Sequence, residues 1–162
     1  MNSSALAALL QEFYRDKHAL QARHVEGATH VSAYEFNNTY QYIINREDTH
    51  LNWVRAALVD AGLPVPTDWP SHPLPGGKGE ALQRAIIEDD ARLVQAFHDK
   101  WAPRQDGITH VRHANMIRVI LGEAIEHKRF FDQMLEGRED VLGRRMAGAT
   151  TGGGVLPVRW IE

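Results

Sequence analysis

Apolar residues recur at helical spacing in four stretches of the chain, whereas the alternation expected of strands is essentially missing. Ser3 or Ser4 can cap the first stretch, and Gly27 and Gly62 follow the first and the second. The pattern therefore predicts an all-α protein with four long helices. These helices are expected to cover about 4–26, 29–61, 78–101 and 109–135.

The connection between the second and third predicted helices is rich in proline, which neither a helix interior nor a central strand tolerates. The other two connections are short, so each joins an antiparallel pair of helices. An extended segment of roughly 15 residues spans at most roughly 50 Å, while a helix of roughly 25 residues is roughly 38 Å long. The sequence thus predicts two hairpins joined by a crossover that runs the full length of a four-helix bundle.

The last part of the chain has a different composition, with a charged stretch followed by a run of three glycines at Gly152–Gly154. We expect one domain, the helical bundle, over residues 1–136. Residues 137–162 are expected to form an extended or flexible C-terminal tail.

The composition narrows the chemistry. A formal net charge of −3 argues against a nucleic-acid partner. The absence of cysteine excludes thiolate metal sites, iron–sulfur centres and disulfides, so any metal must bind oxygen and nitrogen. No secretory signal and no apolar stretch of membrane-spanning length is present, which leads us to expect a cytoplasmic protein without a membrane partner.

The two predicted hairpins resemble each other in sequence. Gly27-Ala28-Thr29-His30-Val31 precedes the second apolar stretch, and Gly107-Ile108-Thr109-His110-Val111 precedes the fourth. Further along, an offset of 76 residues pairs Glu47 with Glu123 among matching apolar residues. This repetition predicts that both acids lie at equivalent points of the bundle.

Glu47 and Glu123 each occupy an apolar helical face, so we expect both carboxylates to point inward. Buried carboxylates need compensation, since burial without a partner costs several kcal/mol or leads to protonation. Divalent metal ions would supply it. The neighbours agree: Glu47 and His50 form a Glu-x-x-His run, and Glu123 and Glu126 repeat its spacing.

With these motifs the chain resembles the ferritin-like superfamily, nearest to rubrerythrins and bacterioferritins. Glu47 to Pro64 looks like the second helix of bacterioferritins, and Glu123 to Asp132 resembles the last helix of rubrerythrins. The resemblance implies a ferritin-like bundle with two iron ions, or manganese, that oxidises Fe(II) or reduces peroxide or oxygen. It also implies one acid each from the first and third helices, for which Glu12 and Glu88 are the candidates.

The expected ligands are therefore Glu12, Glu47, His50, Glu88, Glu123 and Glu126. Alternatives remain at three positions: Asp16 for Glu12, Asp90 for Glu88 and His127 for Glu126. Most other histidines, His24 among them, lie near predicted hairpin ends, where surface or capping roles suffice. The tyrosines at positions 14, 40 and 42 are expected to serve in packing.

Other functions stay open beside the di-iron hypothesis. Full rubrerythrins carry a cysteine-ligated module that this chain lacks, so the resemblance implies that the electron donor is a separate protein or the iron itself. A homodimer is also expected. One alternative is a mononuclear-metal bundle, similar to DinB-like proteins, that uses His50, Glu123 and His127. Others are an iron-storage cage, which the Gly-rich tail disfavours, and a bundle with a degenerate site. The number of metal ions per chain distinguishes these hypotheses.

Overall fold

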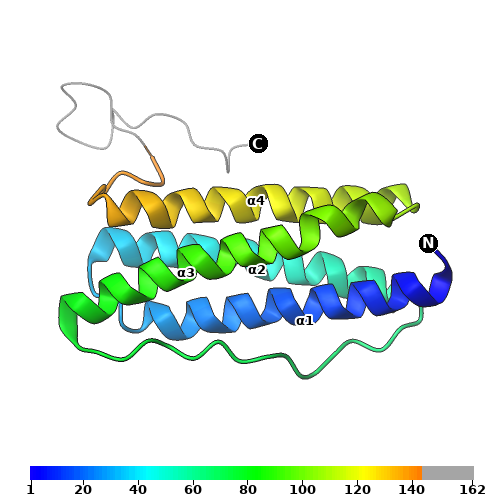
Figure 1. Ribbon diagram of the computed structural model, residues 1–162, viewed down its shortest axis with the longest axis horizontal. Coiled ribbons are helices and arrows are strands. Elements are labelled where there is room, and N and C mark those ends of the chain that lie inside the picture. The colour runs from blue at the N-terminus through cyan, green and yellow to red at the C-terminus, as the bar shows by residue number, and fades with distance from the viewer. Residues whose placement is uncertain (144–162) are drawn as a thin grey trace.

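A computed structural model describes residues 1–143, and its four long helices match the number that the sequence predicts (Figure 1). A short 3-10 helix, which the sequence did not predict, lies between the last two. The elements are α1 (Ser3–Ala28), α2 (Tyr34–Asp60), α3 (Gly79–Trp101), η1 (Ala102–Gly107) and α4 (Val111–Leu135). The predicted C-terminal tail lies outside the described residues from position 144 onward.

Two helix starts differ from the prediction. Asn2, rather than Ser3 or Ser4, caps α1, because its side-chain oxygen accepts a hydrogen bond from the Ala5 amide at 2.8 Å. The second helix begins at Tyr34 instead of residue 29. Asn37 explains the delay, since its side-chain amide donates to the carbonyls of Ala28 (3.0 Å) and Val31 (3.1 Å) and holds the intervening turn.

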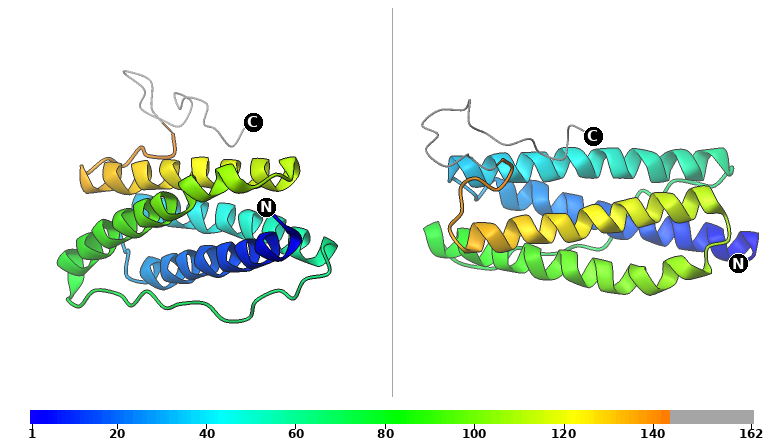
Figure 2. Two further views of the ribbon diagram at one scale, coloured as in Figure 1. Left: turned by 45° about the vertical axis from the view of Figure 1, so that its right-hand side comes forward. Right: turned by 90° about the horizontal axis from the view of Figure 1, so that it is seen from above.

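The helices form two antiparallel hairpins, α1 with α2 and α3 with α4, as predicted. Each helix packs against two others, while α1 and α4, like α2 and α3, lie diagonally opposite in the described part of the chain (Figure 2). The long crossover runs along α1 from one end of the bundle to the other, which makes α2 and α3 parallel (Figure 1). This is the arrangement of a ferritin-like bundle.

Side chains of α1 fasten the crossover along its whole length. Near its start, Gln11 donates to the Pro64 carbonyl at 3.1 Å. In the middle, the His18 ring stacks on Trp69 with 3.5 Å between ring centroids. Near its end, Arg23 donates to the Pro73 carbonyl at 3.1 Å. Proline has no backbone N–H to donate, but its carbonyl oxygen accepts hydrogen bonds. Side chains of α1 therefore hold this proline-rich segment mainly by donating to its carbonyl oxygens.

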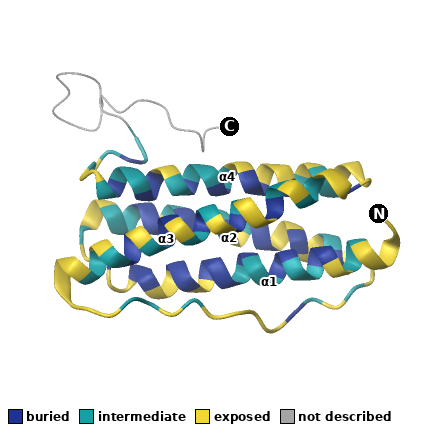
Figure 3. Cartoon of the chain, in the orientation of Figure 1, coloured by how far each residue is buried: buried dark blue, intermediate teal, exposed yellow. Residues whose placement is uncertain are grey.

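The core lies along the bundle axis, where the inward faces of all four helices are buried (Figure 3). Val119 is an exception: the sequence places it on the buried face of the fourth helix, but it is 48% exposed. No helix among residues 1–143 is both long enough and apolar enough to cross a membrane.

Candidate functional site

The bundle interior contains an unusual number of ionisable side chains in place of apolar ones. Each is at most 2% exposed, although charged groups are rarely buried completely unless they are paired. All four helices contribute, so these groups meet inside the bundle. The set comprises Lys17, Arg23, His24, Glu47, His50, Asp90 and His127.

Glu47 points into the interior, as the sequence predicts, and it is fully buried. Its Oε1 lies 2.6 Å from His24 Nδ1, and its Oε2 lies 3.4 Å from Lys17 Nζ. Burial opposes ionisation of Glu47, but the charges of His24 and Lys17 outweigh it and lower the pKa of the carboxyl to about 2. Glu47 is therefore an ionised carboxylate that protein side chains already compensate.

Lys17 supplies much of this compensation from α1. Its side chain is 1% exposed, and its ammonium lies 5.5 Å from the centroid of the Phe97 ring in a cation–π contact. Sequence reasoning missed this residue because lysines usually extend their charge to water. A signal was present: Lys17 follows Phe13 by four residues and precedes Leu20 by three, which puts it on the apolar stripe of α1.

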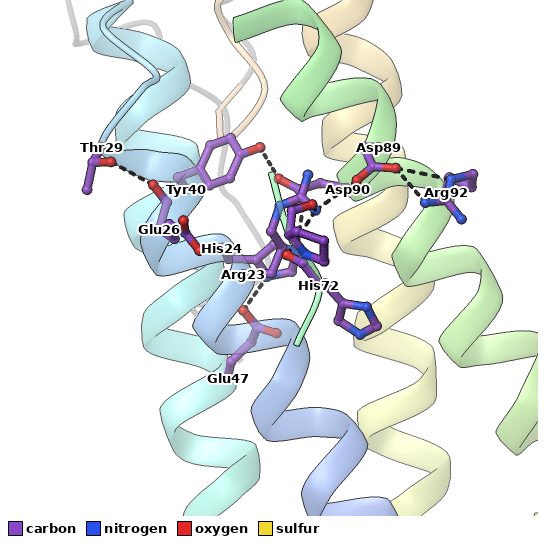
Figure 4. Close-up of polar contacts among 11 residues, drawn as sticks. Arg23, His24, Glu26, Thr29, Tyr40, Glu47, His72, Asp89, Asp90 and Arg92 are labelled. Carbon is purple, nitrogen blue, oxygen red and sulfur yellow. Dashed lines mark hydrogen bonds and ion pairs between the residues drawn. The ribbon is translucent and has the colours of Figure 1, made fainter. Parts of the chain in front are cut away.

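His24 links Glu47 to a second buried acid, Asp90 of α3. The His24 Nε2 atom lies 3.9 Å from Asp90 Oδ1, and the Tyr40 hydroxyl donates to Asp90 Oδ2 (Figure 4). Burial works against a charged His24, but Glu47 and Asp90 raise its pKa above the ordinary value. The expectation that His24 is a surface or capping residue is wrong, since it is completely buried.

Arg23 lies beside Asp90 and compensates its negative charge (Figure 4). Its Nε lies 3.4 Å from Asp90 Oδ1, and its Nη1 lies 2.8 Å from Asp89 Oδ2. The same guanidinium bonds the crossover at Pro73. Asp90, the sequence-based alternative to Glu88, is thus buried, but it is held by Arg23 and Tyr40.

Glu123 of α4 lies in a second cluster with two residues of α2. Arg46 binds its carboxylate with both Nε (2.7 Å) and Nη2 (2.9 Å), and His50 Nε2 lies 2.5 Å from its Oε2. Burial raises the pKa of Glu123, but the hydrogen bonds from His50 and Arg46 prevail and bring it to about 2. The two acids are equivalent in the sequence repeat, but their contacts differ: Glu47 is bound by residues of α1, and Glu123 is bound by residues of α2.

His127 lies one turn after Glu123 and faces the same interior. Its ring is nearly parallel to that of His50, with 6.2 Å between centroids. Burial first, and then the positive charge of Lys17, lower the pKa of His127 well below its ordinary value. Burial also lowers the pKa of His50. Both imidazoles are consequently neutral near pH 7. Glu126, the predicted ligand beside His127, is only partly buried.

Glu12 and Glu88 are not brought to this interior. The Glu12 side chain is 42% exposed and pairs with Arg104 at 2.8 Å and Lys100 at 3.0 Å. Glu88 is 54% exposed and pairs with Arg84 at 3.0 Å. Asp16, the alternative to Glu12, binds Lys100 at 2.6 Å.

These positions allow the fit of metal ions to be tested. Within residues 1–143, no three or more His, Asp or Glu side chains are grouped so that they could hold a metal ion as they stand. The six residues expected for a two-metal site are not assembled, and the positive charge predicted to come from metal comes from Lys17, His24 and Arg46. Buried atoms with unused bonding capacity nevertheless remain, among them His50 Nδ1 and Asp90 Oδ1.

Comparison with known proteins supports the fold. A crystal structure described as ferritin like, diiron-carboxylate proteins from Bacillus anthracis str. Ames superimposes with a TM-score of 0.66. The match covers 83% of this chain and 99% of that one at 12% sequence identity. Neither a protein-family model nor a curated protein matches the sequence. The chain thus has a ferritin-like fold.

Proposed function

We propose that this bundle binds one transition-metal ion per chain between α2 and α4, through His50, Glu123 and His127. The observation that carries the proposal is the placement of two buried imidazoles and a carboxylate on facing turns of these helices, with 6.2 Å between the imidazole rings and 2.5 Å between His50 and Glu123. Two imidazoles and a carboxylate suit Fe(II), Mn(II) or Zn(II).

The main competitor for a metal ion is Arg46. Its guanidinium binds both oxygens of Glu123, and the Arg46 and Glu123 side chains are 32% and 18% exposed. A metal must displace at least one of these two bonds and the proton between His50 and Glu123. Since Arg46 is partly exposed, it can be released towards solvent at a lower cost than a fully buried group.

Lys17 is the reason to propose one metal rather than two. A second ion would require additional carboxylates from α1 and α3, but α1 places an ammonium against Glu47, and Glu12 and Glu88 lie near the surface with arginine partners. Metal and ammonium beside the same carboxylate would repel each other strongly in a dry interior. Lys17 therefore supplies the positive charge that a second metal ion would otherwise provide.

A bound Fe(II) ion with three protein ligands would keep open positions at which oxygen or peroxide can be reduced. The residues of this chain would hold the ion, exclude bulk water and fix the charge around it. Oxidoreductase activity is the function that we propose for the loaded protein. Metal binding itself is the part that can be tested first.

The test is a metal count. Metal is first removed from the protein with a chelator. The protein is then incubated anaerobically with Fe(II) or with Co(II) and desalted, and elemental mass spectrometry measures the number of metal ions per chain. We expect one ion per chain, with visible Co(II) bands typical of nitrogen and oxygen ligands. His127→Ala and Glu123→Gln should lose the ion, whereas the partly exposed His98→Ala serves as a matched control and should retain it.

Arg46→Gln provides the sharpest check, because removal of the competing guanidinium should increase metal affinity by about tenfold. Circular dichroism confirms that each variant keeps its helices. Two ions per chain would favour the di-metal hypothesis over this proposal. No ion in the wild type, or one that survives both ligand substitutions, would rule the proposed site out.

A further inference from the structure

A groove of about 630 Å³ lies between the second half of α2 and the first half of α4. Trp53 and Ala57 line it from α2, and Met116 and Val119 line it from α4. Ala56 and Ala61 also border it, and these small residues leave the space that larger side chains would fill. Its volume is that of a site for a small organic molecule.

The walls of the groove are apolar, but their side chains are partly exposed to solvent. Trp53 is 38% exposed and Val119 is 48% exposed. Val111 and Val59 do not line the groove but adjoin its lining residues in sequence, and they are 71% and 59% exposed. Large apolar side chains grouped in this way on a folded surface mark a binding site more often than chance. The wall chemistry therefore favours a ligand with an apolar body.

One end of the groove carries an arginine and two histidines. His110 and His113 stack with 4.1 Å between ring centroids, and Arg112 lies between them in sequence. Burial first, and then the charges of His110 and Arg112, lower the pKa of His113. Within residues 1–143 Arg112 has no ion pair, although Asp60 also lines the groove. An anionic head group would supply the missing partner, and Asp60 disfavours more than one negative charge.

Trp53 connects this groove to the interior. One side of its ring faces the groove, while the Arg46 guanidinium lies 5.9 Å and the His50 ring 5.6 Å from its centroid. A molecule in the groove would therefore lie one aromatic ring away from Glu123 and its partners. The binding argument, however, depends only on the groove and needs no metal.

From the apolar walls and the cationic end we infer that the groove binds a small organic monoanion with an apolar body, such as a medium-chain carboxylate. The body lies against Trp53 and Val119, and the carboxylate pairs with Arg112. This site goes beyond the proposed metal function and would exist if that proposal failed.

The experiment compares decanoate with decanamide, which has the same chain and no charge. Titration is followed in the metal-free protein by ¹H–¹⁵N NMR. We expect saturable one-to-one binding of decanoate, with shifts at the Trp53 indole and at residues 110–119. Arg112→Gln should weaken decanoate binding by about tenfold and leave decanamide unchanged, because it removes only the charged contact.

Arg129→Gln is the matched control, since Arg129 is an exposed arginine of the same helix, roughly 25 Å away along its axis. It should bind decanoate like the wild type. Equal effects of the two substitutions, or shifts outside the groove, would overturn the inference. So would a stable dimer by sedimentation that Val119→Asp dissociates and decanoate does not, because a second copy would then occupy this face.

Discussion

Lys17 Nζ and Glu47 Oε2 lie 3.4 Å apart, and neither side chain reaches solvent. The pair joins α1 to α2 inside the bundle at a depth where water cannot compensate either charge. Such pairs add little net stability compared with apolar residues of the same shape, but removal of one partner leaves an uncompensated buried charge. The pair is therefore expected to show strongly non-additive effects of substitutions at its two positions rather than a large contribution to the free energy of unfolding.

This coupling predicts the behaviour of substitutions at the two positions. Lys17→Met and Glu47→Gln should each lower the free energy of unfolding by about 3–5 kcal/mol, and the double variant should recover much of that loss. Urea unfolding of the metal-free protein measures all three. Single substitutions that cost less than about 1 kcal/mol would show that water reaches the pair.

The pKa shifts predict a stability maximum in mildly acidic solution. Glu47 has a lowered pKa of about 2, so its contribution is complete above about pH 4.5 and disappears as the pH falls towards 2. His24 has a raised pKa, so its contribution is complete below about pH 6.5 and disappears as the pH rises through the folded-state value. His127 and His50 have lowered pKa values, so their contribution is complete above about pH 6.5 and is lost as the pH falls towards the folded-state values. Stability should therefore peak near about pH 6.5.

Urea unfolding between pH 2 and pH 9 tests this dependence. Glu47 should account for on the order of 3 kcal/mol of the acid loss. In Glu47→Gln the acid branch should flatten, and the alkaline branch should weaken because His24 loses its nearest carboxylate. An acid branch identical to that of the wild type would contradict the assignment to Glu47.

Tyr40 and Tyr14 form a matched pair of buried tyrosines. Tyr40→Phe removes the donor to Asp90 Oδ2 and leaves a buried acceptor unsatisfied, so it should destabilise the protein by about 1–3 kcal/mol. Tyr14 is 7% exposed and has no hydroxyl bond within residues 1–143, so Tyr14→Phe should change stability by less than about 0.5 kcal/mol. Thermal unfolding by calorimetry distinguishes the two.

Two helical glycines predict opposite outcomes for the same substitution. A Cβ at Gly27 would lie 3.1 Å from Ile86 Cγ2, because α1 and α3 approach closely there. A Cβ at Gly122 meets no atom within 4 Å. Gly122→Ala should therefore stabilise the protein by about 0.5–1 kcal/mol through helix propensity. Gly27→Ala should show no gain, or a loss of about 1 kcal/mol. Equal gains would contradict the close packing at Gly27.

Much of the fold follows from local patterns in the sequence. The apolar spacing predicted four helices, and the prolines between α2 and α3 predicted the crossover, since each signal depends on neighbouring residues alone. The start of α2 was placed five residues early because the side chain of Asn37 holds a turn through contacts that periodicity does not encode. Val119 likewise is exposed because it lines the groove between α2 and α4, a tertiary feature that periodicity does not encode.

The site was harder to predict, for an electrostatic reason. Helical phase correctly placed Glu47 inside, but it could not reveal which charge compensates it. A metal ion, a lysine and a histidine all serve this purpose, and the choice depends on α1, which is distant in sequence. Lys17 and His24 lay on the predicted apolar face, and a search for inward cations as well as inward acids would have found them.

The crossover also sets a limit on changes in chain length. Residues 61–78 reach roughly 55 Å at about 3.1 Å per residue, whereas the distance that they must span is the length of α2, roughly 40 Å. Surface loops usually accept deletions, but this one has only a few residues to spare before α3 could no longer begin at its own end of the bundle. Natural variation in this connection should therefore favour insertions, and a shortened version would have to reverse the direction of the second hairpin.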